Sequence, residues 1–324
     1  TTTAATVPDQ TFTVTPNLGI APAAGNVGDA VTANGTGFAA NEVGVQVTFA
    51  STPTVVATVD ADGAGSWTAT FNVPPTPTGD HTVDAGGPTT LASSVPDRTF
   101  RVRPKLSLEP PSGHVADRLI VRGSGFLPGE RGISVVYDGL RFDTGGIGAV
   151  RTDANGAWEA ALTIPEGPGG LKQVTFVGDQ TLCAATDGCP AIFNLMPSLF
   201  INPDEGRVGD LVDAIGRGFK AGEAVTNFVW DDTDIVHLAP ITADPRGRWA
   251  GAFRVPSASN GPHKVGAEGG AGSLVAEADK PTFTIMPAAI YFEVAGPSGS
   301  TLVRRAPFRV GDTATVVGEG FIPT

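Results

Sequence analysis

Basic residues and long apolar runs are scarce in this sequence of 324 residues. Only 21 lysines and arginines accompany 33 acidic residues, so the formal net charge is −12. Nucleic-acid binding needs a basic stripe, and the longest basic run is Arg304-Arg305. No apolar stretch reaches the roughly 18 residues of a membrane-spanning helix. We therefore expect no nucleic-acid partner and no membrane span.

Charged residues make up only 17% of the chain, whereas apolar residues make up 41%. That balance argues against a coiled coil and a charge-driven disordered chain, and it leaves enough apolar material for packed cores. Glycine (43) and proline (27) are abundant and spread along the whole chain. Because both interrupt helices, we expect a turn-rich, all-β protein.

Cysteine is also rare. Cys183 and Cys189 flank the short polar segment AATDG, with no histidine cluster nearby to suggest zinc. One interpretation is a local disulfide that pins a hairpin, stabilising it by roughly 2 kcal/mol through loop closure. The other is two buried free thiols. We favour the disulfide, which indicates an oxidising, extracellular location.

Three motifs recur in the same order along the chain. The first is a strand that ends in proline, at Pro16, Pro104, Pro197 and Pro287. The second is G-x-G-F, and the third is D-x-x-G-x-W, with tryptophans 91 residues apart. The repeated residues are Gly35, Gly37, Phe38 and Trp67; Gly123, Gly125, Phe126 and Trp158; Gly216, Gly218, Phe219 and Trp249; and, in an opening G-x-G-F only, Gly318, Gly320 and Phe321.

This recurrence predicts three complete repeats with a fragment at each end. The first fragment resembles the end of a repeat, because VPDQTFTVTP is similar to VPDRTFRVRP. The chain is then either a window on a longer array, which we favour, or a subunit with complementary incomplete ends. The predicted domains are residues 1–16 (last strand of a preceding repeat), 17–104, 105–197 and 198–287 (repeats one to three) and 288–324 (opening part of a fourth).

Seven short strands can be placed in the second repeat, which fits an immunoglobulin-like β-sandwich. Alternation over 158–164 predicts that the even positions face a core. A phosphate-binding role for G-x-G-F would need a helix immediately after it, and another strand follows instead, so we interpret the motif as structural. The predicted strands are 106–108, 118–122, 133–137, 147–152, 157–164, 171–177 and 191–195.

The order G-x-G-F, a Pro/Ala-Gly-Glu turn (Leu127–Glu130 and Lys220–Glu223) and D-x-x-G-x-W resembles IPT/TIG-like immunoglobulin-type repeats. The resemblance implies a tandem array of sandwiches in a large bacterial or archaeal cell-surface protein. Such modules occur in adhesins, surface-layer proteins and accessory regions of enzymes, so the resemblance is specific for fold and weak for function. The first repeat departs from the turn pattern at Ala39–Glu42.

Motifs for enzyme chemistry are absent: no G-x-S-x-G, H-E-x-x-H or G-x-x-x-x-G-K-[ST] occurs. A proline follows each repeat tryptophan by seven residues, at Pro74, Pro165 and Pro256. His81 and His263 lie seven residues after the first and third of these prolines, and Lys172 holds the same position in the middle repeat. Because the repeat spacing sets this position, and a ligand or catalytic base would not normally be placed by such spacing, we interpret all three as surface strand positions. We expect no catalytic residue and no bound cofactor.

Calcium is the one metal to consider, because hard cations prefer clustered oxygen donors. Asp60 and Asp62 form one cluster, and Asp231, Asp232 and Asp234 form another. Neither completes an EF-hand loop or recurs in every repeat, so ordinary acidic turns are the favoured interpretation.

The leading functional hypothesis is mechanical: a rod-like segment of a surface layer (S-layer), filament or stalk, stiffened by a single proline at each junction. Subunits could also associate head to tail by strand donation through Phe12. Alternatives are an adhesin that binds glycans, with Trp230 as candidate contact although a core position is favoured, and an accessory region of a secreted enzyme.

Overall fold

The computed structural model describes residues 12–49, 54–142, 150–181, 189–235 and 239–287, and it describes 289–295, 302–304 and 314–319 by their backbone. The regular elements among them are β-strands and two 3-10 turns, Ala92–Ser94 and Glu277–Asp279. The predicted all-β class is therefore confirmed. In the described part of the chain, no helix has the length and apolar character needed to cross a bilayer.

The chain divides into two compact units, and the boundary between them runs through the second repeat. The first unit comprises Thr1–Glu109, Ile120–Leu162 and Gln173–Ile192. The second comprises Pro110–Leu119, Thr163–Lys172 and Phe193–Thr324.

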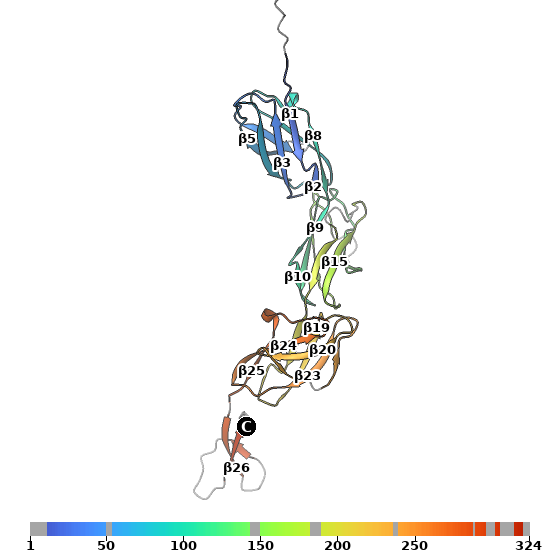
Figure 1. Cartoon of the computed structure of the whole chain (residues 1–324). Helices are drawn as coiled ribbons and strands as arrows, with labels where there is room; N and C mark the ends of the chain where they lie inside the picture. The colour runs from blue at the N-terminus through green and yellow to red at the C-terminus, as the bar shows by residue number, and fades with distance from the viewer. Residues whose placement is uncertain are drawn as a thin grey trace, which may run out of the picture. The chain divides into compact units, whose positions relative to one another are not determined.

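In the first repeat, eight strands form two facing sheets (Figure 1). One sheet has the order β1-β3-β6 and the other β2-β8-β7-β4-β5. The short β2 runs parallel to β8, and the other neighbouring strands of these two sheets pair antiparallel. A first strand divided between the two sheets is compatible with an immunoglobulin-like sandwich. The strands are β1 (Asn17–Ala21), β2 (Ala24–Asn26), β3 (Ala30–Thr36), β4 (Val45–Phe49), β5 (Thr54–Val59), β6 (Trp67–Asn72), β7 (Gly79–Gly86) and β8 (Arg98–Arg103).

The second repeat has the same arrangement, with the orders β14-β11-β9 and β10-β16-β15-β12-β13. Six of its seven predicted strands correspond to observed ones. Of the seventh, predicted over 147–152, only Val150–Thr152 is described, and it forms no strand. The strands are β9 (Lys105–Glu109), β10 (Ser112–Gly113), β11 (Arg118–Ser124), β12 (Ser134–Tyr137), β13 (Leu140–Phe142), β14 (Trp158–Thr163), β15 (Gly170–Val177) and β16 (Ala191–Leu195).

The third repeat again has two sheets, β17-β19-β23 and β18-β25-β24-β20-β21, with β22 paired to β20. After it, three strands form a small sheet of order β27-β26-β28. The strands are β17 (Ser198–Asn202), β18 (Glu205–Gly206), β19 (Leu211–Arg217), β20 (Ala224–Trp230), β21 (Thr233–Ile235), β22 (Ile241–Thr242), β23 (Trp249–Arg254), β24 (Gly261–Gly269), β25 (Thr282–Ile285), β26 (Ala289–Ala295), β27 (Leu302–Arg304) and β28 (Ala314–Glu319).

The first and third sandwiches each enclose an apolar core. The last strand of every repeat contributes a phenylalanine with no exposed surface: Phe100, Phe193 and Phe283. Along β14, Trp158, Ala160 and Leu162 are buried while the residues between them are exposed, so the predicted alternation is confirmed. The cores of the first and third repeats also contain Trp67 and Trp249.

Candidate functional site

The two most specific motifs, G-x-G-F and D-x-x-G-x-W, contact each other in every complete repeat. The first glycine of G-x-G-F lies against the tryptophan: a Cβ on Gly35 would stand 2.1 Å from the indole of Trp67. The corresponding closest distances are 2.0 Å for Gly123 with Trp158 and 2.1 Å for Gly216 with Trp249. A residue with any side chain would therefore displace the ring, which explains why glycine recurs.

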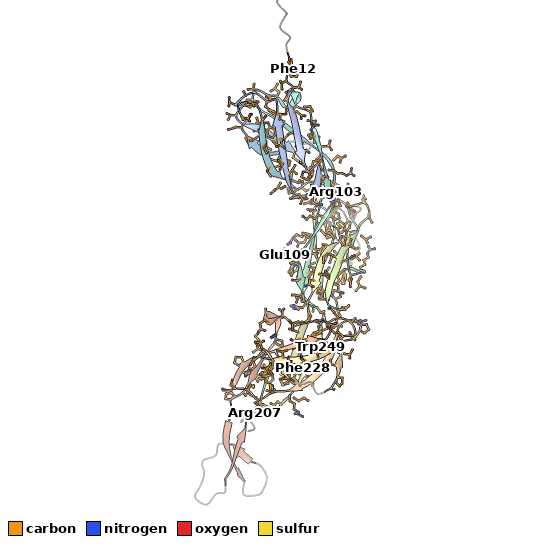
Figure 2. The ribbon with its side chains drawn as sticks, viewed as in Figure 1. Phe12, Arg103, Glu109, Arg207, Phe228 and Trp249 are labelled. Atoms are coloured by element: carbon orange, nitrogen blue, oxygen red, sulfur yellow. The ribbon has the colours of Figure 1, made fainter. Side chains whose placement is uncertain are left out.

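The phenylalanine of G-x-G-F packs edge-on against the same tryptophan. The ring centroids are 5.4 Å apart for Phe38–Trp67, 5.5 Å for Phe126–Trp158 and 5.3 Å for Phe219–Trp249. Edge-to-face pairs of this kind stabilise a core beyond simple burial. Figure 2 shows Trp249 beside Phe228, a second aromatic neighbour at 5.6 Å.

Backbone hydrogen bonds join the same two motifs. The N–H of Phe38 donates to the carbonyl of Gly65, the glycine of the D-x-x-G turn, at 3.0 Å. Equivalent bonds join Phe126 to Gly156 and Phe219 to Gly247, each also at 3.0 Å. The two motifs thus form one structural unit.

The second glycine of G-x-G-F adopts a positive φ and approaches the backbone at the end of the preceding repeat. Gly125 has a φ of 68°, and a Cβ there would stand 2.6 Å from the carbonyl oxygen of Arg103. Gly218 bears the same relation to Met196. Only glycine adopts this conformation without strain. In each complete repeat the motif leads into a turn and a strand, not a helix, as the structural interpretation expected.

A further backbone contact links successive repeats within each unit. In the first unit, the N–H of Thr78 donates to the carbonyl of Phe126 at 3.3 Å. In the second unit, the N–H of Gly169 donates to the carbonyl of Phe219 at 2.9 Å. The donor lies in both cases in the loop after a proline that follows the motif tryptophan by seven residues, Pro74 or Pro165, and the acceptor is the motif phenylalanine of the next repeat.

A glutamate four residues after each motif phenylalanine proves to be buried. Glu42, Glu130 and Glu223 are 5%, 1% and 6% exposed. Each carboxylate accepts backbone N–H bonds from a distant loop, such as those of Thr89 and Thr90 to Glu42, both at 2.7 Å. Sequence reasoning noted the Glu in the turn but missed its role, although the constant spacing in FAANE, FLPGE and FKAGE was available as a signal.

These hydrogen bonds change the acidity of Glu42. Burial alone would raise the pKa of its carboxyl group, but the bonds from Thr90, Thr89 and Ala39 outweigh burial. The pKa of Glu42 therefore lies below its ordinary value. We call this buried carboxylate, which holds the backbone of Thr89 and Thr90 by hydrogen bonds, the Glu42 clamp.

Gln180 and Thr181 supply the equivalent N–H donors to Glu130, at 3.0 and 2.8 Å. For Glu223 the equivalent donor from a distant loop is the N–H of Ala271, at 3.0 Å, and the N–H of Lys220, in the same turn as Glu223, donates at 2.7 Å.

His81, Lys172 and His263 hold the same position in the three repeats, and the expectation that they lie on the surface is wrong. Lys172 and His263 are buried, at 6% and 8% exposure, and His81 is half-buried. The reason is that polar partners accompany them into the interior. His263 Nδ1 faces Asp231 Oδ2 at 2.5 Å, and its Nε2 faces the carbonyl of Ser259 at 2.7 Å.

Both partners of the His263 ring are acceptors, so both ring nitrogens donate only when the imidazole is protonated. Burial alone would lower the pKa of His263, but the bonds to Asp231 and Ser259 outweigh it and raise the pKa above its ordinary value. The pKa of Asp231 is lowered, because bonds from His263 and Lys264 outweigh the effect of burial.

Trp230 is part of the core, as favoured from the sequence. It is 4% exposed, stacks on His263 at a centroid distance of 5.0 Å and contacts Phe253 and Phe283. It therefore offers no exposed ring to a ligand. The exposed aromatic that sequence reasoning missed is Phe200, which lies in the continuous apolar run Leu199–Ile201.

The calcium candidates have protein partners. Asp62 Oδ1 accepts the N–H groups of Ala64 and Ser66, both at 2.9 Å, and Asp60 Oδ1 accepts that of Gly44 at 2.8 Å. Among the described residues, no three His, Cys, Asp or Glu side chains are grouped so that they could hold a metal ion. Calcium binding stays untested.

The second acidic cluster is arranged around cations of the protein itself. Asp231 is paired with His263, and Asp232 lies 3.3 Å from Lys280 Nζ. Asp234 lies on β21, beside the same turn.

The predicted disulfide and the predicted strand donation involve residues at or beyond the ends of the described segments. Cys189 is buried, and Cys183 lies outside the described residues, so the disulfide stays a prediction. Phe12 is 89% exposed and, as Figure 2 shows, lies at the N-terminal end of the described chain. Residues 12–16 form no strand of their own.

The chain is similar to several solved structures, all with low sequence identity and low TM-scores. The adhesin InvE of Yersinia pseudotuberculosis is 13% identical with a TM-score of 0.25, over 57% of this chain and 59% of InvE. A Bacteroides ovatus protein, SGBP-B in complex with a mixed-linkage heptasaccharide, is 7% identical with a TM-score of 0.25, over 98% of this chain and 91% of that one.

Escherichia coli alpha-2-macroglobulin is 10% identical with a TM-score of 0.23, over 91% of this chain and 28% of its own. TM-scores of this size carry neither fold nor function from one chain to another. A search of the curated proteins found no match.

A family model gives the specific result. The IPT/TIG domain matches residues 18–100, which include the first G-x-G-F and the first D-x-x-G-x-W. The match covers about a quarter of the chain. The resemblance inferred from the repeated motifs is confirmed over these residues, where the first repeat matches the IPT/TIG domain.

Proposed function

We propose that the chain is a non-catalytic structural segment of an extracellular surface protein, in a surface layer, filament or stalk. The observation that carries the proposal is the recurring bond from Thr78 to Phe126 and from Gly169 to Phe219. A contact that recurs in repeat register suits a chain that bears load. The predicted Cys183–Cys189 disulfide supports an extracellular location.

The same contacts support a semi-rigid junction. A single proline separates successive repeats, with no Gly/Ser linker between them. We expect a chain whose junctions hold one orientation and do not behave as flexible beads. The backbone bond can be tested at Thr78, because proline there removes the N–H donor, while alanine keeps it.

Small-angle scattering on the full chain would test the junction. We expect Thr78→Ala to scatter like the unchanged protein, and Thr78→Pro to show a broader distribution of end-to-end distances. Insertion of Gly-Ser-Gly-Ser after Pro104 gives the flexible reference. If the unchanged chain already matches that reference, or if it collapses to a compact particle, the proposal of a load-bearing rod is wrong.

A second candidate function is self-association by strand donation. Phe12 and Val14 are 89% and 65% exposed, whereas their repeat equivalents Phe100 and Val102 are 0% and 1% exposed. The same two positions are buried in the other repeats, at Phe193 and Leu195 and at Phe283 and Ile285. The alternation of this segment is that of a strand whose apolar face is covered by a sandwich.

Sedimentation velocity over a concentration series would test strand donation. We expect the unchanged chain to form larger species that Phe12→Asp abolishes. Thr13→Asp, on the opposite face of the same segment, should leave them intact. A chain that stays monomeric at all concentrations, or association that both variants retain, would remove strand donation while leaving the junction proposal standing.

A further inference from the structure

The outer face of the β17-β19-β23 sheet differs from the same face in the other two repeats. Phe200 pairs with Ile215, and Ile215 pairs with Ala250, so an apolar row crosses all three strands. Phe200 is 63% exposed. Among the aromatic side chains that the structure describes, only Phe12 and Phe200 are exposed.

The equivalent rows in the first two repeats are polar. In the first repeat the row is Gly19, Asn34 and Thr68, with the Thr68 hydroxyl donating to Asn34 at 2.8 Å. In the second repeat Ser107 pairs with Arg122, whose guanidinium bonds to Glu159. The fold therefore does not require an apolar row here, and Phe200 needs a reason other than packing.

Phe200 lies at a cleft of about 330 Å³. Its lining residues all belong to the second unit. Two polar residues, Ser198 and Arg217, line the same cleft as Phe200. The side chain of Arg217 is 41% exposed, and its guanidinium lies 3.6 Å from Glu166. The lining consists of Val115, Ser198, Leu199, Phe200, Ile215 and Arg217.

An exposed ring beside hydrogen-bonding groups suits a ligand with one apolar face and a hydroxyl-bearing edge. A pyranose sugar has that character, because its axial C–H groups stack on an aromatic ring while its hydroxyls reach polar side chains. The net charge of −12 disfavours a polyanionic glycan. A neutral sugar therefore fits better than an acidic one.

The size of the site argues against a protein partner. A stable protein interface needs about 20–30 residues on each side, whereas six residues line this cleft. The apolar row is also bordered by polar residues, because Asn202, Asp213 and Arg254 occupy outward positions on the same three strands. Small-ligand clefts typically combine an apolar wall with a few polar groups.

We propose that the third repeat binds a neutral glycan at Phe200, with one sugar ring stacked on the phenylalanine and its hydroxyls bonded to Ser198 and Arg217. This activity goes beyond the structural role and does not depend on it.

The test is native gel electrophoresis of the full chain through gels that contain a neutral polysaccharide: soluble starch, xylan or a β-glucan. We expect one of them to retard the unchanged chain. Phe200→Ser places the second repeat's own residue at this position, so the fold should tolerate it, and it should weaken binding by about tenfold or more. Phe200→Trp should retain polysaccharide binding, because it keeps an aromatic ring at this position.

Leu211→Ser is the matched control, because Leu211 is 49% exposed on the same face but does not line the cleft. It should leave binding unchanged. If none of the neutral polysaccharides retards the chain, or if Phe200→Ser is retarded as strongly as the unchanged chain, the proposal is wrong. Sedimentation that reveals a dimer lost only in Phe200→Ser would likewise overturn it, by assigning the face to a second copy.

Discussion

Gly35 lies so close to the indole of Trp67 that a Cβ at position 35 would stand 2.1 Å from the ring. The substitution Gly35→Ala should therefore destabilise the first repeat by about 1–3 kcal/mol through overpacking. Gly19 is the matched control, because it lies on the neighbouring strand and its nearest contact to a Cβ would be 3.9 Å.

Hydrogen exchange followed by mass spectrometry on the full chain would measure this effect repeat by repeat. Faster exchange should appear in the first repeat of Gly35→Ala and not in Gly19→Ala. Equal protection in the two variants would show that the indole moves aside at little cost.

Glu42 should be as important to the first repeat as a core residue. Replacing it by glutamine removes the charge that holds the N–H groups of Thr89 and Thr90, at a cost of about 1–3 kcal/mol. The exposed pair Asp80–Arg101 offers a control, since Asp80→Asn should change stability by less than about 0.5 kcal/mol.

The pKa of Glu42 is lowered in the folded state, so its stabilisation is present above the unfolded pKa and is lost as the pH falls through the folded one. Urea unfolding at neutral and acidic pH would measure this loss. An acid dependence that is identical in Glu42→Gln would contradict the assignment of the clamp.

The repeat motifs could be read from the sequence because their physical causes are local and recur. Glycine contacts tryptophan at Gly35 and at Gly216 for the same reason, so the spacing repeats. The burial of His263 could not be read this way, because its acceptor Asp231 comes from a turn 32 residues away. Charged residues are normally exposed, and nothing local to position 263 indicates otherwise.

Phe200 shows a second limit of sequence reasoning. It lies between Leu199 and Ile201, so an apolar run hides the alternation that would mark it as outward-facing. Only the register with Ile215 shows which face it occupies. The fold class thus followed from periodicity, whereas the candidate binding site depends on comparing one surface position among three repeats.

Calcium should have no effect on stability. Asp232 already has Lys280 as its cation, and Asp62 accepts two turn N–H groups. Thermal unfolding in excess calcium chloride and in a chelator should give the same midpoints, because a ligand stabilises only by binding the folded state. A midpoint several degrees lower in the chelator would instead indicate a metal site.

The two cysteines should be joined to each other. Alkylation of the unfolded chain without reductant should then leave Cys183 and Cys189 unmodified, and alkylation after reduction should modify both. Intact-mass measurement distinguishes the two states directly. Two modified cysteines before reduction would support the alternative of buried thiols and would weaken the case for an oxidising location.

The pairing of His263 with Asp231 predicts a pH dependence confined to the third repeat. The pKa of His263 is raised, so its contribution to stability is full below the unfolded pKa and is lost as the pH rises through the folded one. The pKa of Asp231 is lowered, so its contribution is lost only as the pH falls through its folded pKa. The pair should therefore stabilise the repeat most at a pH between the unfolded-state pKa values of aspartate and histidine, about 4 and 6.5.

Hydrogen exchange at several pH values, corrected for the intrinsic rate, would report protection in β24 on the full chain. Protection should decline as the pH rises from the unfolded pKa of His263 through its folded pKa, and His263→Gln should remove that decline. His81→Gln is the control, because His81 has the Thr76 hydroxyl, which can donate as well as accept, at 3.5 Å instead of a carboxylate. A decline that persists in His263→Gln would place the titrating group elsewhere in the third repeat.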